Sequence, residues 1–332
     1  MTGRQESDKR VDDRIKKLLG KYPKIIEDFF YSLTECAATT RGAYTEHVMA
    51  YFEYLDKEGF DYSNPRKFSE VKPNHINKYL EYLKFHRKDS EEGQVSEGTR
   101  AKKFYAIRKF YEFLLDNEYI DNSPCNRVKP PRVTDEKEII AMTPEEVKIL
   151  KENIKNGVGS HRAKAFQKHY INRDLAIVSL GCTTGLRVGS ICEINMDDVD
   201  IDNRTIIVRE KGNKARTIRI GENTAKAIND WMIDRWMMFI GFCDDALFVS
   251  GAGKRLHPRD IALMLKKYSV GIDKPITPHK MRSTCATNLY EATGDIFLVQ
   301  DILGHKNIAN TRRYAKMSEK RREEAVNILD KM

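Results

Sequence analysis

The sequence predicts a mainly α-helical protein of two domains, the second of which also contains a small antiparallel β-sheet. Three observations predict this fold class. Apolar residues recur with helical spacing over most of the chain, a charged stretch with several prolines interrupts the pattern, and two short runs of strand composition flank a polar turn. The length of 332 residues is about twice that of a typical domain, which agrees with two domains.

A helical bundle is predicted over residues 25–127, after a short N-terminal lead of residues 1–24. Helical spacing is clear in IIEDFFYSL, YTEHVMAYFEYL, INKYLEYLKF and residues 99–115. The last of these segments has one apolar stripe, made of Phe104, Ile107, Tyr111 and Leu114. Lys102 and Lys109 lie on the opposite face, where they either solvate the helix or contact phosphate groups.

Residues 128–142 are predicted to be a linker, because prolines oppose helix formation there and most of the other residues are polar or charged. The second domain, residues 143–332, begins with a helix. Thr143 supplies the N-cap of this helix, Pro144 its first residue, and Glu146 the acidic partner of a capping box.

Further helices and one hairpin are predicted in the second domain. The helices cover residues 172–184, 187–194, 223–240, 258–270, 278–293, 295–303 and 318–330. The hairpin joins TIIVRE to ARTIRI through the polar turn Lys211-Gly212-Asn213-Lys214.

The composition favours a soluble globular protein with polyanionic partners. Hydrophobic residues make up 40% of the chain and charged residues 32%, which is enough to build a core and argues against disorder. The 58 Lys and Arg against 49 Asp and Glu give a net charge of +9, which favours nucleic acid as a partner. The six cysteines form no CxxC pair and indicate reduced thiols. A signal peptide and a membrane-spanning segment are not recognisable, so a cytoplasmic protein is expected.

Several patterns imitate known sites but lack the residues that such sites need. DVDID at residues 198–202 starts like a calcium loop, but glycine is missing from its sixth position and glutamate from its twelfth. GAGK at residues 251–254 lacks the glycine spacing and the Ser/Thr of a phosphate-binding loop. The sequence contains neither HExxH nor GxSxG. These patterns therefore predict no metal site.

Basic residues gather where helices and turns begin. Arg187 follows Gly185, which can end the preceding helix, so the arginine lies at a helix junction. His279 and Arg282 are three residues apart in the first turn of a helix that TP begins, so they are expected to project from one face. Backbone amides, helix dipole and guanidinium would together bind an anion there. Each of these features alone is also common on ordinary protein surfaces.

The stretch TRRYAK places Tyr314 beside three basic residues, Arg312, Arg313 and Lys316, and Lys306 comes shortly before it. His305 precedes Tyr314 by nine residues. A single tyrosine usually packs or forms a hydrogen bond, and a single histidine is usually structural. Alternatively, the phenol is a nucleophile placed where a phosphate group binds.

Together these segments resemble the tyrosine recombinase (phage integrase) family, particularly its short, two-domain Xer-like members. The resemblance rests on TTGLRVGSICEI, KGNKARTIRI, TPHKMRSTCATNLYEATGD and LGHKNIANTRRYAK, in the family's order and approximate spacing. GTRAKKFYAIRKFYEFL and NSPCNRVKPPR likewise resemble the end of the family's first domain and its linker. The resemblance implies a SAM-like core-binding DNA domain at residues 25–127 and a catalytic domain of tyrosine recombinase type at residues 143–332.

The resemblance also implies the site residues and the reaction. The catalytic set would be Arg187, Lys211, His279, Arg282, His305 and Tyr314. Lys102, Lys109 and Lys214 are further candidates for contact with DNA, and Lys214 is a second candidate for proton donation. In the family, such residues cleave one strand at a time through a 3′-phosphotyrosyl link, without metal or cofactor, and exchange strands through a four-way junction. The family commonly has an acidic residue where Ser190 stands here.

The partners implied are double-stranded DNA and a homotetramer, or a heterotetramer with a related recombinase, at the nucleoid. Chromosome dimer resolution and the integration or excision of a mobile element both fit. The two domains are expected to clamp duplex DNA, and the last helix to dock on its own chain or on a neighbouring protomer. Two alternatives remain, a DNA-relaxing enzyme of the type IB topoisomerase kind and a nonenzymatic DNA-binding protein on the same scaffold.

Overall fold

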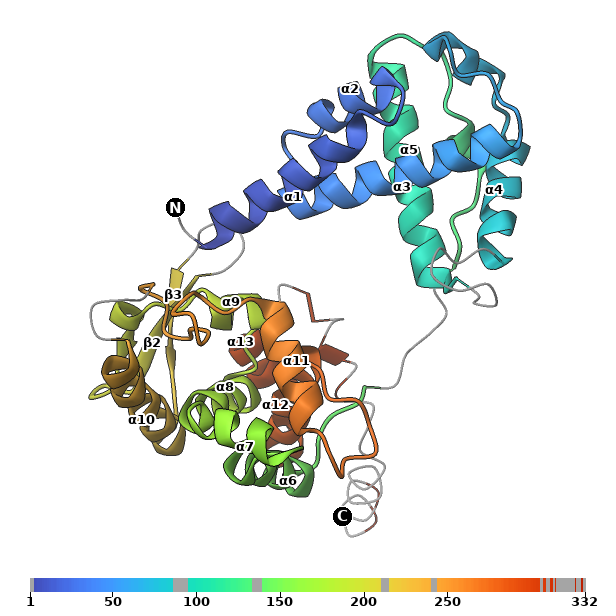
Figure 1. The fold of residues 1–332 in the computed structure, drawn as a ribbon. Helices are drawn as coiled ribbons and strands as arrows, with labels where there is room; N and C mark the ends of the chain where they lie inside the picture. The colour runs from blue at the N-terminus through green and yellow to red at the C-terminus, as the bar shows by residue number, and fades with distance from the viewer. Residues whose placement is uncertain are drawn as a thin grey trace. The chain divides into compact units, whose positions relative to one another are not determined.

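The protein forms two compact units, Met1–Glu136 and Lys137–Met332. A computed structural model describes residues 3–85, 95–132, 139–209, 215–239 and 244–304, together with residues 307, 308, 311, 312, 314, 326 and 330. Both units are mainly helical, and the second also contains a three-stranded antiparallel sheet of order β1-β2-β3 (Figure 1). The predicted fold class is confirmed.

The first unit is a helical bundle with an aromatic core. Its α-helices are α1 (Gly3–Leu19), α2 (Lys24–Ser32), α3 (Ala38–Lys57), α4 (Pro73–Phe85) and α5 (Glu97–Asp116), with 3₁₀ helices at Pro65–Glu70 and Pro124–Arg127. Helix α3 packs against both α1 and α5. The whole predicted stripe of α5 is buried in this core, namely Phe104, Ile107, Tyr111 and Leu114. Tyr111 also shares a hydrogen bond of 3.1 Å with the hydroxyl of Tyr51 on α3.

Helix α1 fills most of the segment that was predicted to be only a lead. Ile15 and Leu19 are buried in the core of the first unit. Gly42 on α3 allows the close approach, because a Cβ there would lie 2.9 Å from Cγ1 of Val11. The sequence pattern did not indicate this helix because its first half, GRQESDKR, is polar all round.

The second unit surrounds a three-stranded sheet with helices. Its elements are α6 (Pro144–Asn156), α7 (His161–Lys168), α8 (Ile171–Thr184), α9 (Val188–Cys192), β1 (Val199–Asp200), β2 (Thr205–Arg209), β3 (Ala215–Arg219), α10 (Glu222–Met238), α11 (Pro258–Tyr268), α12 (Pro278–Thr293) and α13 (Ile296–Leu303), with a 3₁₀ helix at Met196–Asp198. The hairpin is confirmed, since β2 pairs antiparallel with β3. The capping box of Thr143 and Glu146 is also confirmed. Helix α7 was not predicted, and the predicted helix 318–330 lies outside the described residues except for positions 326 and 330.

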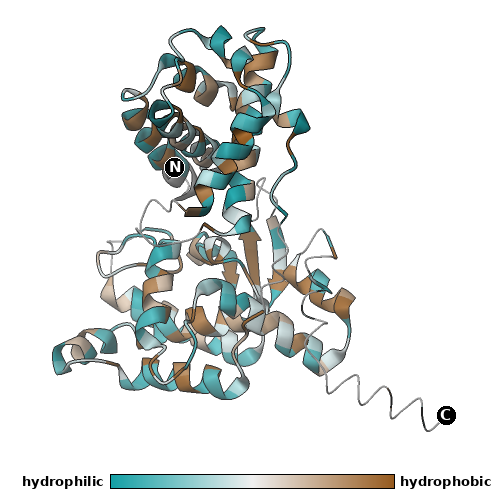
Figure 2. Cartoon of the chain, turned by 90° about the vertical axis from the view of Figure 1, so that its right-hand side faces the viewer, coloured by the Kyte–Doolittle hydropathy of each residue, from teal (hydrophilic) through white to brown (hydrophobic). Residues whose placement is uncertain are grey.

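Helix α8 is the centre of the second unit. It packs against α10 and α12 and lies between them in Figure 1. Because neighbouring elements cover α8 on all sides, its fully buried side chains point in several directions. These side chains are Ala176, Ile177, Val178 and Leu180. Most other helices of both units alternate between hydrophilic and hydrophobic residues (Figure 2). The direction of α8 therefore fixes where its C-terminal turn lies relative to α12.

Within the described ranges, no helix combines the length and the apolar character that a membrane-spanning helix needs. The same part of the chain shows no group of three or more His, Cys, Asp or Glu side chains placed to hold a metal ion.

Candidate active site

The turn that ends α8 is built around Gly185. This residue has the left-handed φ of +61°, and its N–H donates to the carbonyl of Gly181 at 3.2 Å. A Cβ at position 185 would overlap Cδ2 of Leu303 and lie 3.3 Å from Sγ of Cys285. Only glycine satisfies both the φ and the space. The turn is therefore pressed against α12 and α13, and it places Arg187, which is exposed, as the N-cap residue of α9.

A Gly185→Ala substitution is expected to lower the free energy of unfolding by roughly 3 kcal/mol, because it adds both left-handed strain and overlap with Leu303. Chemical denaturation followed by circular dichroism measures this. Gly189→Ala is the matched control, since a Cβ there meets no atom within 4 Å and φ is not positive. Equal stability of the two variants would contradict the packing described for the turn.

Arg282 ties three segments of the second unit together. It lies in α12 with 5% of its surface exposed. Nη1 donates to the carbonyl of Gly185 at 2.5 Å, and Nη2 donates to the carbonyl of Leu303 at 2.7 Å. The guanidinium is thus held against the turn that precedes Arg187 and against the C-terminal end of α13. His279, which was expected to project from the same face as Arg282, is exposed one turn earlier.

Tyr314 is buried, with 6% of its surface exposed. It belongs to a small apolar cluster with Ala286 of α12 and with Val299 and Leu303 of α13. Leu303 is also the residue whose carbonyl accepts from Arg282. The phenol and the buried guanidinium therefore meet the same end of α13, although they lie 32 positions apart in the sequence.

The two strands that lead into the hairpin turn are fixed at their ends. Arg209, the last residue of β2, forms a bidentate ion pair with Asp198 at 2.5 and 2.8 Å. The hydroxyl of Ser190 donates to the carbonyl of Arg209 at 3.3 Å. Arg216 of β3 donates from Nη2 to the carbonyl of Ile302 at 3.2 Å. The hairpin is thus held to α9 on one side and to α13 on the other.

The structure brings together the segments of four predicted site residues, Arg187, His279, Arg282 and Tyr314. Three further candidates of the second unit, Lys211, Lys214 and His305, lie outside the described residues. Their flanking residues are placed: Arg209 and Ala215 border the hairpin turn, and Gly304 ends α13 in the left-handed conformation with φ of +63°.

Arg216 was missed by the sequence analysis. It lies opposite Val208 in the strand pair and on the same face of β3 as Ile218. Burial alternates along β3, and a basic residue on its more buried face is the signal that could have indicated Arg216. Arg216 and Arg282 donate to two consecutive carbonyls at the C-terminal end of α13. Arg216 donates to the carbonyl of Ile302, and Arg282 donates to the carbonyl of Leu303.

The two candidate DNA-contacting lysines of the first unit differ in their surroundings. Lys102 and Lys109 are both exposed on α5, on the face away from the apolar stripe. Lys109 donates to Glu112 at 3.2 Å, which offsets part of its charge. Lys102 and Lys103 lie near His47 of α3, and burial together with these two ammonium groups lowers the pKa of His47 to about 4 from its ordinary 6.5.

The low pKa of His47 predicts a pH-dependent stability. Between pH 4 and pH 6.5 the unfolded chain binds a proton at His47 and the folded chain does not, so the free energy of unfolding rises with pH across this window. The contribution is fully present above pH 6.5 and is lost as the pH falls toward 4. Urea unfolding of the full chain at about pH 5 and about pH 7 measures the difference. A His47→Gln variant with an unchanged difference would show that another group causes it.

Comparison with known proteins agrees with this arrangement. Residues 140–321 match the phage integrase family, and residues 24–121 match the N-terminal SAM-like domain of phage integrases. A tyrosine recombinase XerC from Caldanaerobacter subterraneus subsp. tengcongensis is 30% identical over 326 residues, covering 92% of this chain and 87% of that protein. XerC of Leptospira interrogans is 25% identical and covers 95% of this chain and 92% of its own length. The XerH recombinase bound to its palindromic difH substrate has a similar fold, with a TM-score of 0.70, 20% identity, and coverage of 92% of this chain and 84% of that one.

The two family matches, together with 30% identity to a relative over 92% of the chain, identify a class of enzymes that cleave and rejoin DNA. The chain belongs to the phage integrase family, as a tyrosine recombinase of the Xer type that acts in site-specific DNA recombination.

Proposed function

We propose that the protein cleaves one DNA strand at a time by forming a 3′-phosphotyrosyl bond at Tyr314. The observation that supports this most is the pair of hydrogen bonds from Arg282 to the carbonyls of Gly185 and Leu303. These bonds join the turn before Arg187, the end of α13 before His305, and the cluster that contains Tyr314.

Arg187 and Arg282 are the groups proposed to bind the scissile phosphate. Attack on a phosphodiester places additional negative charge on its non-bridging oxygens, and guanidinium groups bind such oxygens by charge-assisted hydrogen bonds. Arg282 is preorganised for this role because the protein backbone fixes its plane before DNA binds. Arg187 is exposed at the N-cap position of α9.

Two proton transfers accompany the proposed cleavage. The phenol of Tyr314 loses its proton as its oxygen bonds to phosphorus, and the exposed His279 is the proposed acceptor. The 5′-oxygen leaves as its bond to phosphorus breaks, and Lys211 is the proposed donor of the proton that it takes up, with Lys214 as the second candidate. His305 is proposed to hydrogen-bond a phosphate oxygen. The phosphotyrosyl bond keeps the energy of the phosphodiester, so a 5′-hydroxyl of another strand can reverse the step without a metal or cofactor.

The proposed assembly is a tetramer, either of this chain alone or with a related recombinase, that holds two DNA sites and passes through a four-way junction. The first unit is proposed to bind the core DNA site, and its match to the SAM-like domain supports this role. Lys102 is the more available of the two lysines, because Lys109 already pairs with Glu112. Related enzymes that were crystallised with DNA include XerH on difH and lambda integrase on a COC′ core site.

The proposal is tested by isolating protein–DNA complexes that survive denaturation from cells that produce the protein, and by sequencing the attached DNA. One recurring sequence is expected. Two duplexes that carry this sequence and different labels are then mixed with the purified protein, and joint products are expected. Relaxation of supercoiled DNA without joint products would instead indicate a type IB topoisomerase activity.

A further inference from the structure

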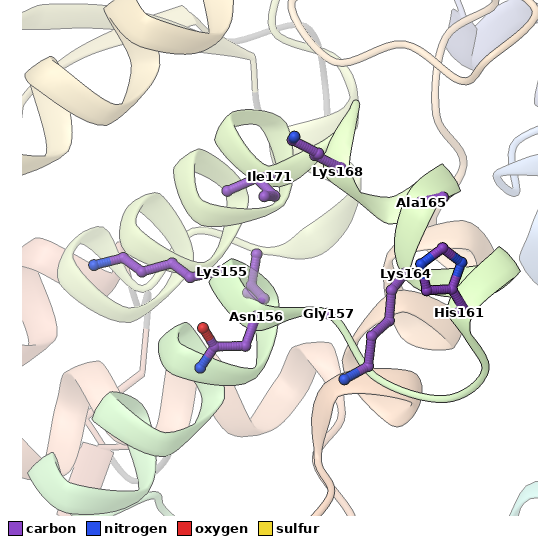
Figure 3. A pocket seen from close by; sticks show the side chains of 9 residues that line it. Lys155, Asn156, Gly157, His161, Lys164, Ala165, Lys168 and Ile171 are labelled. Carbon is purple, nitrogen blue, oxygen red and sulfur yellow. The ribbon is translucent and has the colours of Figure 1, made fainter.

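A basic hollow of about 420 Å³ lies on the second unit, away from the site described above. The last turn of α6, one face of α7 and the first residue of α8 line it (Figure 3). Helix α8 has 14 residues and ends at the Gly185 turn, so the hollow and the Arg187 turn are about 20 Å apart along its axis. The phosphate under attack therefore does not lie in this hollow.

The hollow exists because one face of α7 is basic where an apolar face would be expected. His161, Lys164, Ala165 and Lys168 follow the i, i+3, i+4, i+7 spacing and line it together. The buried side chain of α7 is polar too. Gln167 accepts from the N–H of Val158 at 3.0 Å and donates to its carbonyl at 2.8 Å. The buried contact of α7 is thus a pair of hydrogen bonds to Val158, and not an apolar side chain packed against α6 and α8.

Unneutralised positive charge surrounds the hollow. Three lysines line it, Lys155, Lys164 and Lys168, and no carboxylate does. In the part of the chain that the structure describes, none of these lysines forms an ion pair. Figure 3 shows the side chains of Lys155, Lys164 and Lys168 pointing in different directions. Flexible lysine side chains can turn toward a common anion.

The floor of the hollow is mostly apolar. Its apolar lining residues are Ile171, which is half-buried, Ala165, which is exposed, and Ile154, which is fully buried. Lys164 adds the aliphatic part of its side chain, which packs over Gly157, where a Cβ would lie 3.2 Å from Cγ of Lys164. A hollow of this volume, lined by apolar side chains and by lysines, is a candidate site for a small molecule.

We propose that this hollow binds a free nucleoside polyphosphate, with the base on the apolar floor and the phosphates among the lysines of the rim. A DNA duplex presents its phosphates on a convex surface and needs no apolar concavity, whereas a single nucleotide offers an apolar ring and several negative charges together. Binding there does not require strand cleavage, so its test is independent of the reaction at Tyr314.

Isothermal titration calorimetry of the full chain tests the proposal, with ATP, tripolyphosphate and adenosine as probes in the absence of magnesium. ATP is expected to bind more tightly than either partial probe. The double variant Lys164→Gln/Lys168→Gln is expected to bind ATP at least roughly tenfold more weakly. Ala165→Phe, which fills the hollow at an exposed position without changing charge, is expected to abolish the binding.

The charge-matched control is Lys226→Gln/Lys266→Gln, which removes two exposed lysines that do not line the hollow and is expected to bind ATP as the unaltered protein does. Thermal unfolding of each variant checks that it is folded. The proposal is wrong if ATP releases no heat at about millimolar concentration. It is also wrong if the two double variants bind ATP with equally reduced affinity. A third outcome would also overturn the proposal. If Lys164→Gln/Lys168→Gln binds duplex DNA more weakly but binds ATP as the unaltered protein does, the two lysines belong to the DNA-binding surface.

Discussion

A Tyr314→Phe variant is expected to fold and to bind duplex DNA but to form no covalent DNA complex. Phenylalanine keeps the ring within the cluster of Ala286, Val299 and Leu303 and removes only the hydroxyl oxygen. The free energy of unfolding should therefore change by less than about 1 kcal/mol. Strand cleavage should fall by several orders of magnitude, because the atom that bonds to phosphorus is absent.

Electrophoresis of radiolabelled DNA under denaturing conditions measures the covalent complex, and filter binding measures the noncovalent one. Tyr290→Phe is the matched control, since Tyr290 packs against the same cluster and the substitution removes the same atom. The control should retain the covalent complex. If Tyr314→Phe retained it as well, another residue would be the nucleophile and the proposed mechanism would fail.

Arg282→Ala is expected to impair both stability and catalysis, whereas Arg187→Ala should impair catalysis alone. Removing the buried guanidinium leaves the carbonyls of Gly185 and Leu303 without their donors, which should cost roughly 3 kcal/mol of unfolding free energy. Arg187 is exposed, so its removal should change stability by less than about 0.5 kcal/mol. Each variant should also slow cleavage about a hundredfold or more, because each removes a guanidinium that is proposed to bind the transition state.

Chemical denaturation and single-turnover cleavage, measured on the same preparations, separate the two effects. Arg282→Lys is an informative intermediate, because it keeps the charge but has a single nitrogen in place of the two that reach the two carbonyls. It should recover part of the stability and little of the rate. Unchanged stability of Arg282→Ala would show that the two carbonyl contacts do not hold the segments together.

Local patterns were predictable from the sequence. The capping box at Thr143 and the glycine turn at Gly185 depend on residues within a few positions of one another, and both are present in the structure. The hairpin of TIIVR and ARTIR followed from composition and spacing in the same way. The resemblance to the recombinase family indicated which basic residues and which tyrosine to follow.

Contacts between distant segments were not predictable. The hydrogen bond from Arg282 to Gly185 spans 97 positions, and the one from Arg216 to Ile302 spans 86. Neither partner carbonyl has a signature in the sequence, because every residue has a carbonyl. Helices α1 and α7 were missed for a different reason: they are attached through few apolar side chains, so they lack the periodicity that indicates a helix.

In the proposed mechanism, the burial of Tyr314 would protect DNA against unwanted nicks. Moving the ring out of its cluster with Ala286, Val299 and Leu303 would expose an aromatic side chain, which costs about 2 kcal/mol. Contacts with DNA or with a second protomer would then have to supply that energy before the oxygen bonds to phosphorus. A lone subunit resting on a chromosome would thus leave both strands intact, and breakage would be reserved for complexes already able to reseal what they open.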